Sequence, residues 1–172
     1  MKKTLQVLTR LVTEKVINDF AIGGAVAAIY YTEPSDTSDL DVFITFPPDK
    51  LIVSLTDIYG ALKKKGYTEW KKEGILIEGL PVQFLPVEKG VLKGAFETAQ
   101  PQTIAGTKAK IMTFEYLCLI MLDTGRPKDK VRLASCWGTK NLNQTKFLQL
   151  CKKHGLEKKW QTFYGNFIHD PI

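Results

Sequence analysis

Two aspartates separated by one residue, Asp39 and Asp41, stand at the start of an apolar segment that ends at Phe46. Because successive residues of a strand point to opposite faces, both side chains are expected on the same face, close together. Two carboxylates at such a separation repel each other unless a cation lies between them. Oxygen ligands of this kind suit Mg²⁺ or Mn²⁺, which keep their remaining positions for water and phosphate oxygens. The pair therefore indicates a divalent metal site.

A glycine pair, Gly23-Gly24, lies between an apolar segment at residues 20–22 and a short expected helix at residues 25–31. Glycine lets the backbone come close to a phosphate, and the start of a helix presents N–H groups to it. Alone, a glycine pair is usually a turn, and an Asp-x-Asp pair usually belongs to an exposed polar segment. Here Asp41 falls inside an apolar strand, where an unpaired carboxylate is costly. Strand, Gly-Gly, helix, loop and acidic pair, in this order, therefore indicate phosphoryl or nucleotidyl transfer.

Residues 21–46, from Ala-Ile-Gly-Gly through Asp-Leu-Asp-Val-Phe-Ile-Thr-Phe, resemble the first motif of the nucleotidyltransferase-fold superfamily, to which DNA polymerase β is related. The likeness is to its small prokaryotic branch, akin to AbiEii-type toxins. Glu115-Tyr116-Leu117 followed by residues 125–129 is similar to the C-terminal helical motif of that branch, which is less specific. The resemblance covers most of the chain. It implies an α/β (α+β) fold, with a short mixed sheet flanked by helices and a C-terminal helical subdomain.

The resemblance also implies residue roles. Asp39 and Asp41 are expected to be the catalytic metal ligands, with Mg²⁺ or Mn²⁺ as the cofactor. The residues expected to contact the nucleotide are Gly23, Gly24, Ser38, Arg126, Lys128 and Asp129. From the residues alone, the Arg-Pro-Lys-Asp segment at 126–129 fits a phosphate contact at a helix start and an ordinary capped helix entry equally well.

Two positions depart from the superfamily pattern. Its third acid is expected on a strand at residues 82–86, where this chain has Gln83. An amide can neither take up a proton nor bind a metal as a carboxylate does. Glu78 is a candidate substitute, although its position indicates an exposed residue beside a turn. The lysine that broader relatives carry before the Gly-Arg-Pro segment is also missing. Three lysines are candidates for its positive charge: Lys108, Lys110 and Lys128.

The remaining segments divide the chain into an α/β part and a helical part. Apolar residues recur at helical spacing in residues 2–18 and 51–62. Short strands joined by hairpin turns are expected at residues 67–72, 75–78 and 81–85. Helices separated by Gly, Pro and Asn breaks are expected at residues 113–122, 128–137, 143–154 and 156–167. We therefore expect a nucleotidyltransferase-like α/β core over residues 1–105 and a helical subdomain over residues 106–172 packed on it.

Composition narrows the class of protein. A chain of 172 residues with 44% hydrophobic residues can bury a core without disulfides or structural metal. Its three cysteines have no Cys-x-x-Cys spacing, which argues against a zinc site and suits a reducing compartment. No segment approaches the roughly 20 apolar residues of a membrane span, so we expect a cytoplasmic protein without membrane contact. The net charge of +6 suits a phosphate-rich partner, although solvated surface lysines are the simpler explanation.

The expected function is Mg²⁺-dependent transfer of NMP from an NTP to a hydroxyl of RNA, tRNA included, or of a protein. The resemblance to toxins implies a toxin–antitoxin role with an antitoxin partner. Two other functions remain open. One is a catalytically weakened module that binds nucleotide or a partner protein, which Gln83 favours. The other is an RNA-binding protein whose acidic pair is structural.

Overall fold

The protein is described by a computed structural model that covers residues 1–32, 39–49 and 54–168. This part of the chain forms the helices α1 (Lys2–Thr13), α2 (Gly24–Ile29), α3 (Thr56–Lys64), α4 (Gly90–Glu97), α5 (Phe114–Thr124), α6 (Pro127–Trp137), α7 (Gln144–Lys153) and α8 (Glu157–Phe167). Its strands are β1 (Asp19–Ile22), β2 (Leu40–Thr45), β3 (Trp70–Lys71), β4 (Gly74–Ile77), β5 (Leu80–Pro86), β6 (Gln100–Ile104) and β7 (Thr107–Ile111).

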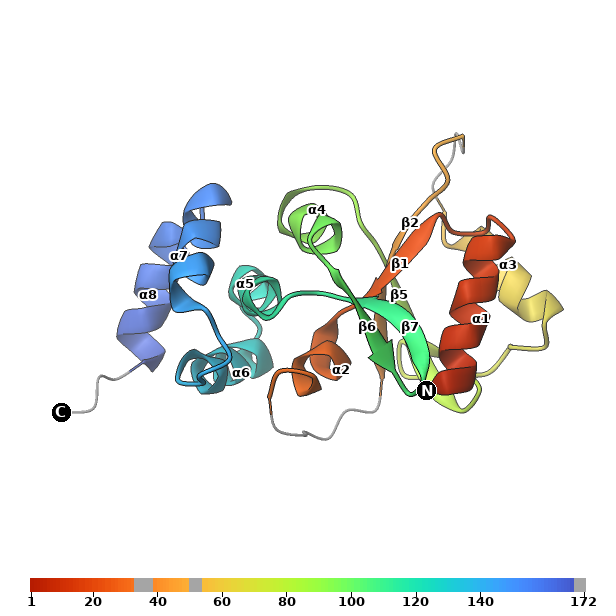
Figure 1. Cartoon of the computed structure of the whole chain (residues 1–172), viewed down its shortest axis with the longest axis horizontal. Helices are drawn as coiled ribbons and strands as arrows, with labels where there is room; N and C mark the ends of the chain where they lie inside the picture. Colours follow the sequence, from red (N-terminus) through yellow and green to blue (C-terminus); the bar gives the residue numbers. More distant parts are fainter. Residues whose placement is uncertain (33–38, 50–53, 169–172) are drawn as a thin grey trace.

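The strands form one mixed sheet in the order β3-β4-β5-β2-β1-β7-β6, seen near the middle of Figure 1. The strand β2 lies at its centre, antiparallel to β1 and parallel to β5. The register of the parallel pair places Asp41 directly opposite Gln83. Since paired residues of neighbouring strands point to the same face, these two side chains share one side of the sheet.

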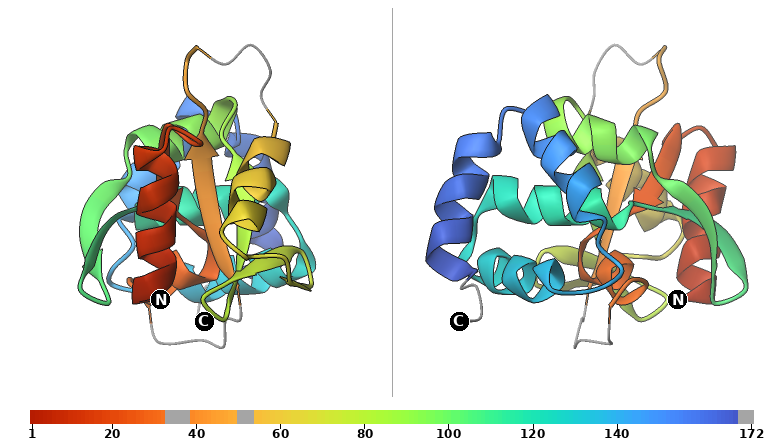
Figure 2. Two further views of the ribbon diagram at one scale, coloured as in Figure 1. Left: turned by 90° about the vertical axis from the view of Figure 1, so that its right-hand side faces the viewer. Right: turned by 60° about the vertical axis from the view of Figure 1, so that its left-hand side comes forward.

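The other side of β2 belongs to the hydrophobic core. Leu40, Val42 and Ile44 are completely buried there. The helices α1 and α3 lie side by side over the sheet, as the left view of Figure 2 shows. The helix α1 contributes fully buried leucines, and α3 contributes Ile58 and Leu62, which are also fully buried. The Thr4 hydroxyl of α1 also donates a hydrogen bond to the carbonyl of Ile77 in β4. The strand is therefore fixed from behind, and only the face that carries Asp41 is left for chemistry.

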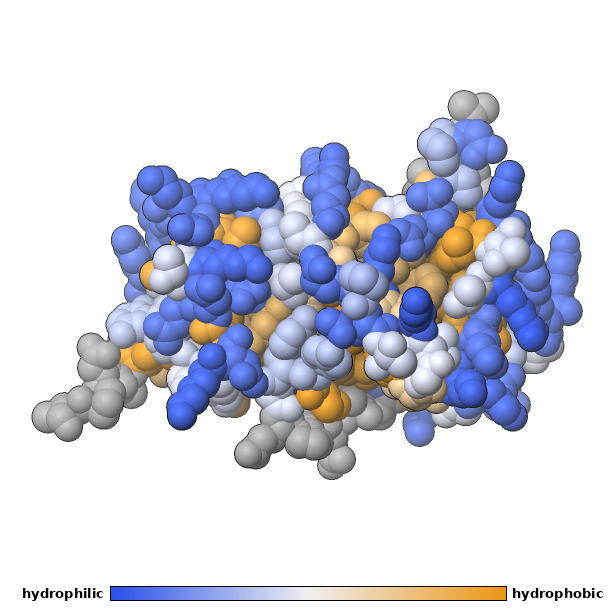
Figure 3. All heavy atoms as spheres, in the orientation of Figure 1, coloured by the Kyte–Doolittle hydropathy of each residue, from blue (hydrophilic) through white to orange (hydrophobic). Residues whose placement is uncertain are grey.

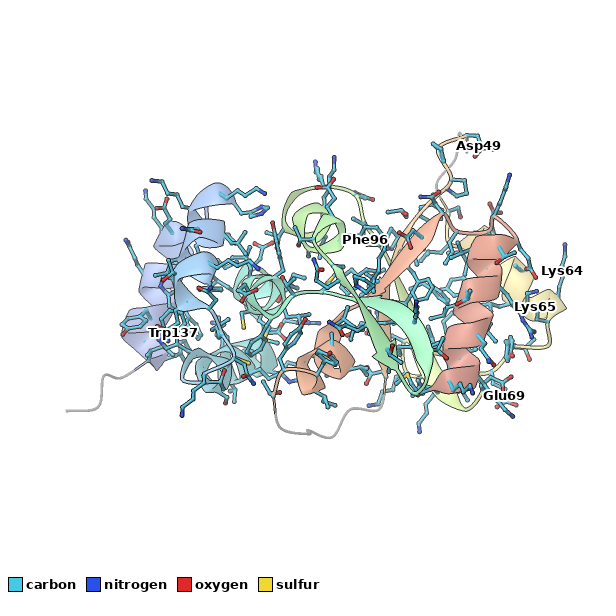
Figure 4. All side chains as sticks on the ribbon, in the orientation of Figure 1. Asp49, Lys64, Lys65, Glu69, Phe96 and Trp137 are labelled. Atoms are coloured by element: carbon cyan, nitrogen blue, oxygen red, sulfur yellow. The ribbon has the colours of Figure 1, made fainter. Side chains whose placement is uncertain are left out.

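The helix α5 joins the sheet to the C-terminal helices. Most of its residues are buried, because α2 and α4 contact it from the sheet side and α6, α7 and α8 from the other. Its buried Glu115 pairs with Lys146 of α7 at 3.1 Å. Beyond it, Trp137, Phe147 and Trp160 form an aromatic cluster, with 4.4 Å between the two tryptophan ring centroids. Figure 4 shows Trp137 at this end of the molecule.

The α/β fold, the mixed sheet and the flanking helices are confirmed, with shifted boundaries. The first helix ends at Thr13 rather than near residue 18. Two residues after its end, Lys15 adopts a left-handed backbone with φ 56°. The elements α4, β6 and β7 were not predicted. The strand β7 lies beyond the expected division at residues 105 and 106, yet it pairs with β1. The sheet therefore extends past that point, and the helical part begins at Phe114.

The face of the molecule shown in Figure 3 is mainly polar. On the face shown in Figure 3, hydrophilic side chains cover most of the surface over the C-terminal helices, with apolar side chains visible between them. Within the described residues, no helix combines the length and apolar character that crossing a membrane requires.

Candidate functional site

A cavity of about 530 Å³ opens between the free face of β2 and the connection from α5 to α6. Asp39, Asp41 and Phe43, alternate residues in and just before β2, all line it. Gln83 and Leu85, which pair with Asp41 and Phe43 in β5, line the same wall. The strand periodicity therefore brings both aspartates to one open site, as the sequence predicted.

The glycine pair contributes to the site mainly through Gly24. Its backbone is left-handed, with φ +58°, and an added Cβ would lie 1.7 Å from Oδ2 of Asp41. Gly23 does not line the cavity. It is buried behind Gly24, where its N–H donates to the carbonyl of Asp41 and its Cα faces the ring of Phe43. The pair thus holds the chain against the acidic strand, and only Gly24 meets the cavity.

The electrostatic environment of Asp41 is unfavourable for a carboxylate. Burial raises the pKa of its side chain above the usual value, and the nearby charge of Asp39 raises it further. The cations Arg126, Lys128 and Arg132 oppose this shift. Among the described residues, none of them forms an ion pair with Asp41. A cation placed against this carboxylate would therefore meet a charge that the protein only partly balances.

The α5–α6 connection forms the opposite wall. Gly125 ends α5, and Pro127 begins α6 directly after Arg126. Asp129 is 3% exposed. It accepts hydrogen bonds from Nε of Arg126 at 2.6 Å and from the Thr124 hydroxyl at 2.9 Å. Asp129 therefore acts on the cavity through Arg126, whose guanidinium it fixes at the rim.

The expected site residues come together only in part. Gly24, Asp39, Asp41, Arg126, Lys128 and Asp129 all line the cavity. Ser38 lies outside the described residues. Of the three lysines considered for the missing positive charge, only Lys128 lines the cavity. Lys110 instead forms an ion pair with Asp19 and lies over the ring of Phe96, which Figure 4 labels.

Three charged residues of the cavity were not predicted: Lys72, Glu73 and Arg132. The position of Arg132 could have been found, because it follows Lys128 by four residues and therefore lies on the same face of α6. Lys72 and Glu73 occupy the turn between β3 and β4. They reach the cavity only through the pairing of β4 with β5, which no local pattern reveals.

The carboxylates fit a hard divalent cation. Asp39 and Asp41 offer oxygen ligands on one cavity wall, which is the chemistry that Mg²⁺ and Mn²⁺ prefer. In the described part of the chain, no three His, Cys, Asp or Glu side chains gather into a metal cluster. A metal held by these two aspartates would therefore share its coordination with water and phosphate oxygens, as expected for a metal that arrives with a nucleotide.

Replacing Gly24 by Ala tests the close packing against Asp41. The left-handed backbone alone should cost roughly 1–2 kcal/mol of unfolding free energy. The added Cβ would also displace the carboxylate, so any stabilisation by Mg²⁺ and nucleotide should be lost. Thermal and urea unfolding measure both effects. Gly60→Ala in α3 is the control, since nothing lies within 4 Å of its added Cβ. Equal responses of the two variants would contradict the packing described here.

Asp41→Asn should stabilise the protein in the absence of metal, and more so at neutral than at acid pH. The folded state raises the pKa of Asp41 above its unfolded value. The wild type therefore loses stability as the pH rises from the unfolded pKa to the folded one, because the unfolded carboxyl ionises first. The variant lacks this loss. The difference in melting temperature should therefore grow as the pH rises above about 4, and it should level off once the folded carboxyl is ionised. A difference for Asp41→Asn that stays constant with pH would contradict the unfavourable environment.

Solved structures of nucleotidyltransferase-like proteins are similar to this chain. An antigenic nucleotidyltransferase-like protein from Paracoccidioides brasiliensis aligns with a TM-score of 0.54 and 18% identity, over 98% of this chain and 94% of that one. The antibiotic-resistance factor ANT(2'')-Ia aligns with a TM-score of 0.46 and 16% identity, over 94% and 91% of the two chains. Its complex with adenylyl-2''-tobramycin aligns with a TM-score of 0.45 and 14% identity, over 97% of each chain.

No protein-family model and no curated protein matches the chain. The first of these likenesses extends over nearly the whole of both chains and establishes the fold. The chain has a nucleotidyltransferase-like fold.

Proposed function

We propose that this protein is a Mg²⁺-dependent nucleotidyltransferase that moves NMP from an NTP to an acceptor hydroxyl. The observation that carries the proposal is that negatively and positively charged side chains line opposite walls of one cavity. Asp39 and Asp41 line one wall, and Arg126, Lys128 and Arg132 line the other. Carboxylates suit the metal and cations suit the triphosphate, so the cavity has complementary places for both halves of a metal–nucleotide complex.

The chain's residues have separate tasks in this reaction. Asp39 and Asp41 hold the metal, which when bound neutralises the triphosphate and polarises the α-phosphate. Gly24 keeps Asp41 in place and lets the nucleotide come close to the backbone. Arg126, oriented by Asp129, presents its remaining N–H donors to phosphate oxygens. Lys128 and Arg132 add positive charge along the same face of α6.

A second hollow supports RNA as the acceptor. Its volume is about 420 Å³, and Met121 and Thr124 line both it and the first cavity. Its wall carries Lys130, Lys158 and Lys159 beside the exposed Phe167, which stacks on the buried Phe163. Cationic side chains bind phosphates, and aromatic rings stack on unpaired bases, so this surface suits a single-stranded RNA end.

Two alternatives have specific support. Gln83 opposite Asp41 favours a module that binds nucleotide with little transfer. The lysine-rich hollow favours an RNA-binding protein without transfer. A protein hydroxyl as the acceptor and an antitoxin partner follow from the resemblance to toxin nucleotidyltransferases and are part of the proposal.

The three cysteines are free and buried, which supports a reducing compartment such as the cytoplasm.

Labelled NTPs, Mg²⁺ and total RNA test the proposal. Wild-type protein should transfer label to RNA, and a protein lysate in place of RNA tests the other acceptor. Binding is measured in parallel by thermal unfolding. At an NTP concentration about 100-fold above Kd the complex gains about 2.7 kcal/mol, which raises the melting temperature of a chain of this size by about 5–10 °C. Both signals should require Mg²⁺.

The variant Asp39→Asn with Asp41→Asn is the matched control. It should remain folded and lose both the thermal shift and the transfer, because the metal ligands are gone. A thermal shift without label transfer in the wild type supports the binding module instead. RNA binding without either signal supports the RNA-binding protein. An unchanged thermal shift in the double variant contradicts the metal site.

Charge reversal at Lys130 and Lys158 tests the RNA surface. If each lysine contacts one phosphate of single-stranded RNA, their loss should reduce the slope of log K against log salt by about 1.4. The nucleotide-induced thermal shift should not change. The control reverses Lys63 and Lys64, exposed residues of α3 at the far end of the molecule, where Figure 4 labels Lys64. If both pairs weaken RNA binding equally, the attraction is general and the hollow has no special role.

A further inference from the structure

Glu73 is a further carboxylate in the cavity that Asp39 and Asp41 line. Gln83 occupies the strand position opposite Asp41, where its amide cannot act as a base. Its Nε2 donates a hydrogen bond to Oε2 of Glu73 at 3.1 Å. Glu73 lines the same cavity as Asp39 and Asp41. A carboxylate is therefore connected to the Gln83 position from a neighbouring turn.

The hairpin brings Glu73 there through close backbone packing. Gly74, the next residue, starts β4, and an added Cβ would lie only 2.9 Å from the backbone nitrogen of Val82. The β3–β4 turn therefore lies against β5 with no room for a side chain at its base. Ile75 pairs with Val82 in the antiparallel β4–β5 pair. This register places Gly74 opposite Gln83, and Glu73 directly precedes Gly74.

We propose that Glu73 is the base that accepts the proton of the acceptor hydroxyl, and that Gln83 positions it. This assignment rests on the proposed nucleotidyl transfer. As the proton passes to a carboxylate oxygen of Glu73, the acceptor oxygen forms a bond to the α-phosphorus. The bond from that phosphorus to the bridging oxygen breaks, and pyrophosphate leaves with its electron pair. Glu73 then releases the proton to solvent, which restores the carboxylate.

The other carboxylates at the site have different partners. Asp129 is buried and accepts hydrogen bonds from Arg126 and Thr124. Glu78 accepts a hydrogen bond from the Tyr67 hydroxyl at 2.6 Å and does not line the cavity. Asp39 and Asp41 are committed to the metal in the proposed function. Glu73 is left as the carboxylate that can reach an acceptor.

Cationic side chains lie near Glu73. Arg126 interacts with it electrostatically from the α5–α6 connection, and Lys72 precedes it in the turn and lines the cavity. Glu73 therefore faces the same cavity as the cations that suit the triphosphate.

The test compares Glu73→Gln with Glu78→Gln, since both residues are exposed glutamates in the turns that flank β4. Two quantities are measured for each full-length protein. One is the thermal shift with NTP and Mg²⁺. The other is pyrophosphate release from labelled NTP with total RNA across the pH range. Glu73→Gln should keep the thermal shift and lose about 10²–10⁴-fold in rate, the usual scale of general-base catalysis. Glu78→Gln should match the wild type in both.

Gln83→Met tests the positioning role. It keeps the length of the side chain and removes the hydrogen bond to Glu73. Gln83→Met should lower the rate in the wild-type background and have no further effect in the Glu73→Gln background, because Gln83 acts through Glu73. A role in packing alone would lower the rate in both backgrounds.

The outcomes separate this assignment from the proposed function. Equal rates for the wild type and Glu73→Gln, with no transfer by the double aspartate variant, overturn the assignment and leave the proposed function standing. Loss of the thermal shift in Glu73→Gln also overturns it, because Glu73 would then belong to the nucleotide or metal site. A wild type that binds NTP but releases no pyrophosphate overturns the transfer function, and the assignment with it.

Discussion

The half-buried charge of Asp41 is the constraint around which the site is arranged. Its strand is fixed from behind by Leu40, Val42 and Ile44, so β2 cannot rotate to carry the carboxylate into open water. Gly24 packs against one carboxylate oxygen, and the nearby charge of Asp39 makes ionisation still less favourable. A sequence selected only for stability would replace such a residue by an apolar one. Its retention in the middle of the sheet is understandable if a cation and a polyphosphate complete the charge balance during function.

The helix α5 makes this arrangement possible, because it belongs to the core and to the cavity wall at once. Its apolar surface binds the C-terminal helices on one side, while Leu117, Ile120 and Met121 line the cavity on the other. The chain then turns at Gly125, so that Arg126 and the face of α6 with Lys128 and Arg132 come back toward β2. The C-terminal helices are thus more than an appendage. Without them, the acidic strand would have no cationic wall opposite it.

Local patterns were sufficient to predict the parts of the site that lie on one element. The alternation around Asp39 and Asp41 fixed their common face, and the Gly-Arg-Pro segment correctly placed a cation at a helix start. Tertiary pairing decided the rest. Residues 107–111 contain two lysines among few apolar residues, yet their strand is held in the sheet by β1. The approach of Glu73 to Gln83 depends on two successive hairpins, whose registers no single segment encodes.

The hydrogen bond from Gln83 to Glu73 gives a physical reason for an amide, rather than a carboxylate, at position 83. A carboxylate in β5 would lie beside Asp41, whose ionisation is already opposed by burial and by Asp39. A third negative charge on that wall would add repulsion wherever metal is absent. The amide avoids this repulsion, and its hydrogen bond holds a carboxylate farther out, on an exposed turn beside Arg126. Besides the buried Asp129, the cavity thus has one carboxylate on a turn and two at the central strand. In the proposed function, this separates the two aspartates that would hold a cation from the glutamate that would meet the acceptor.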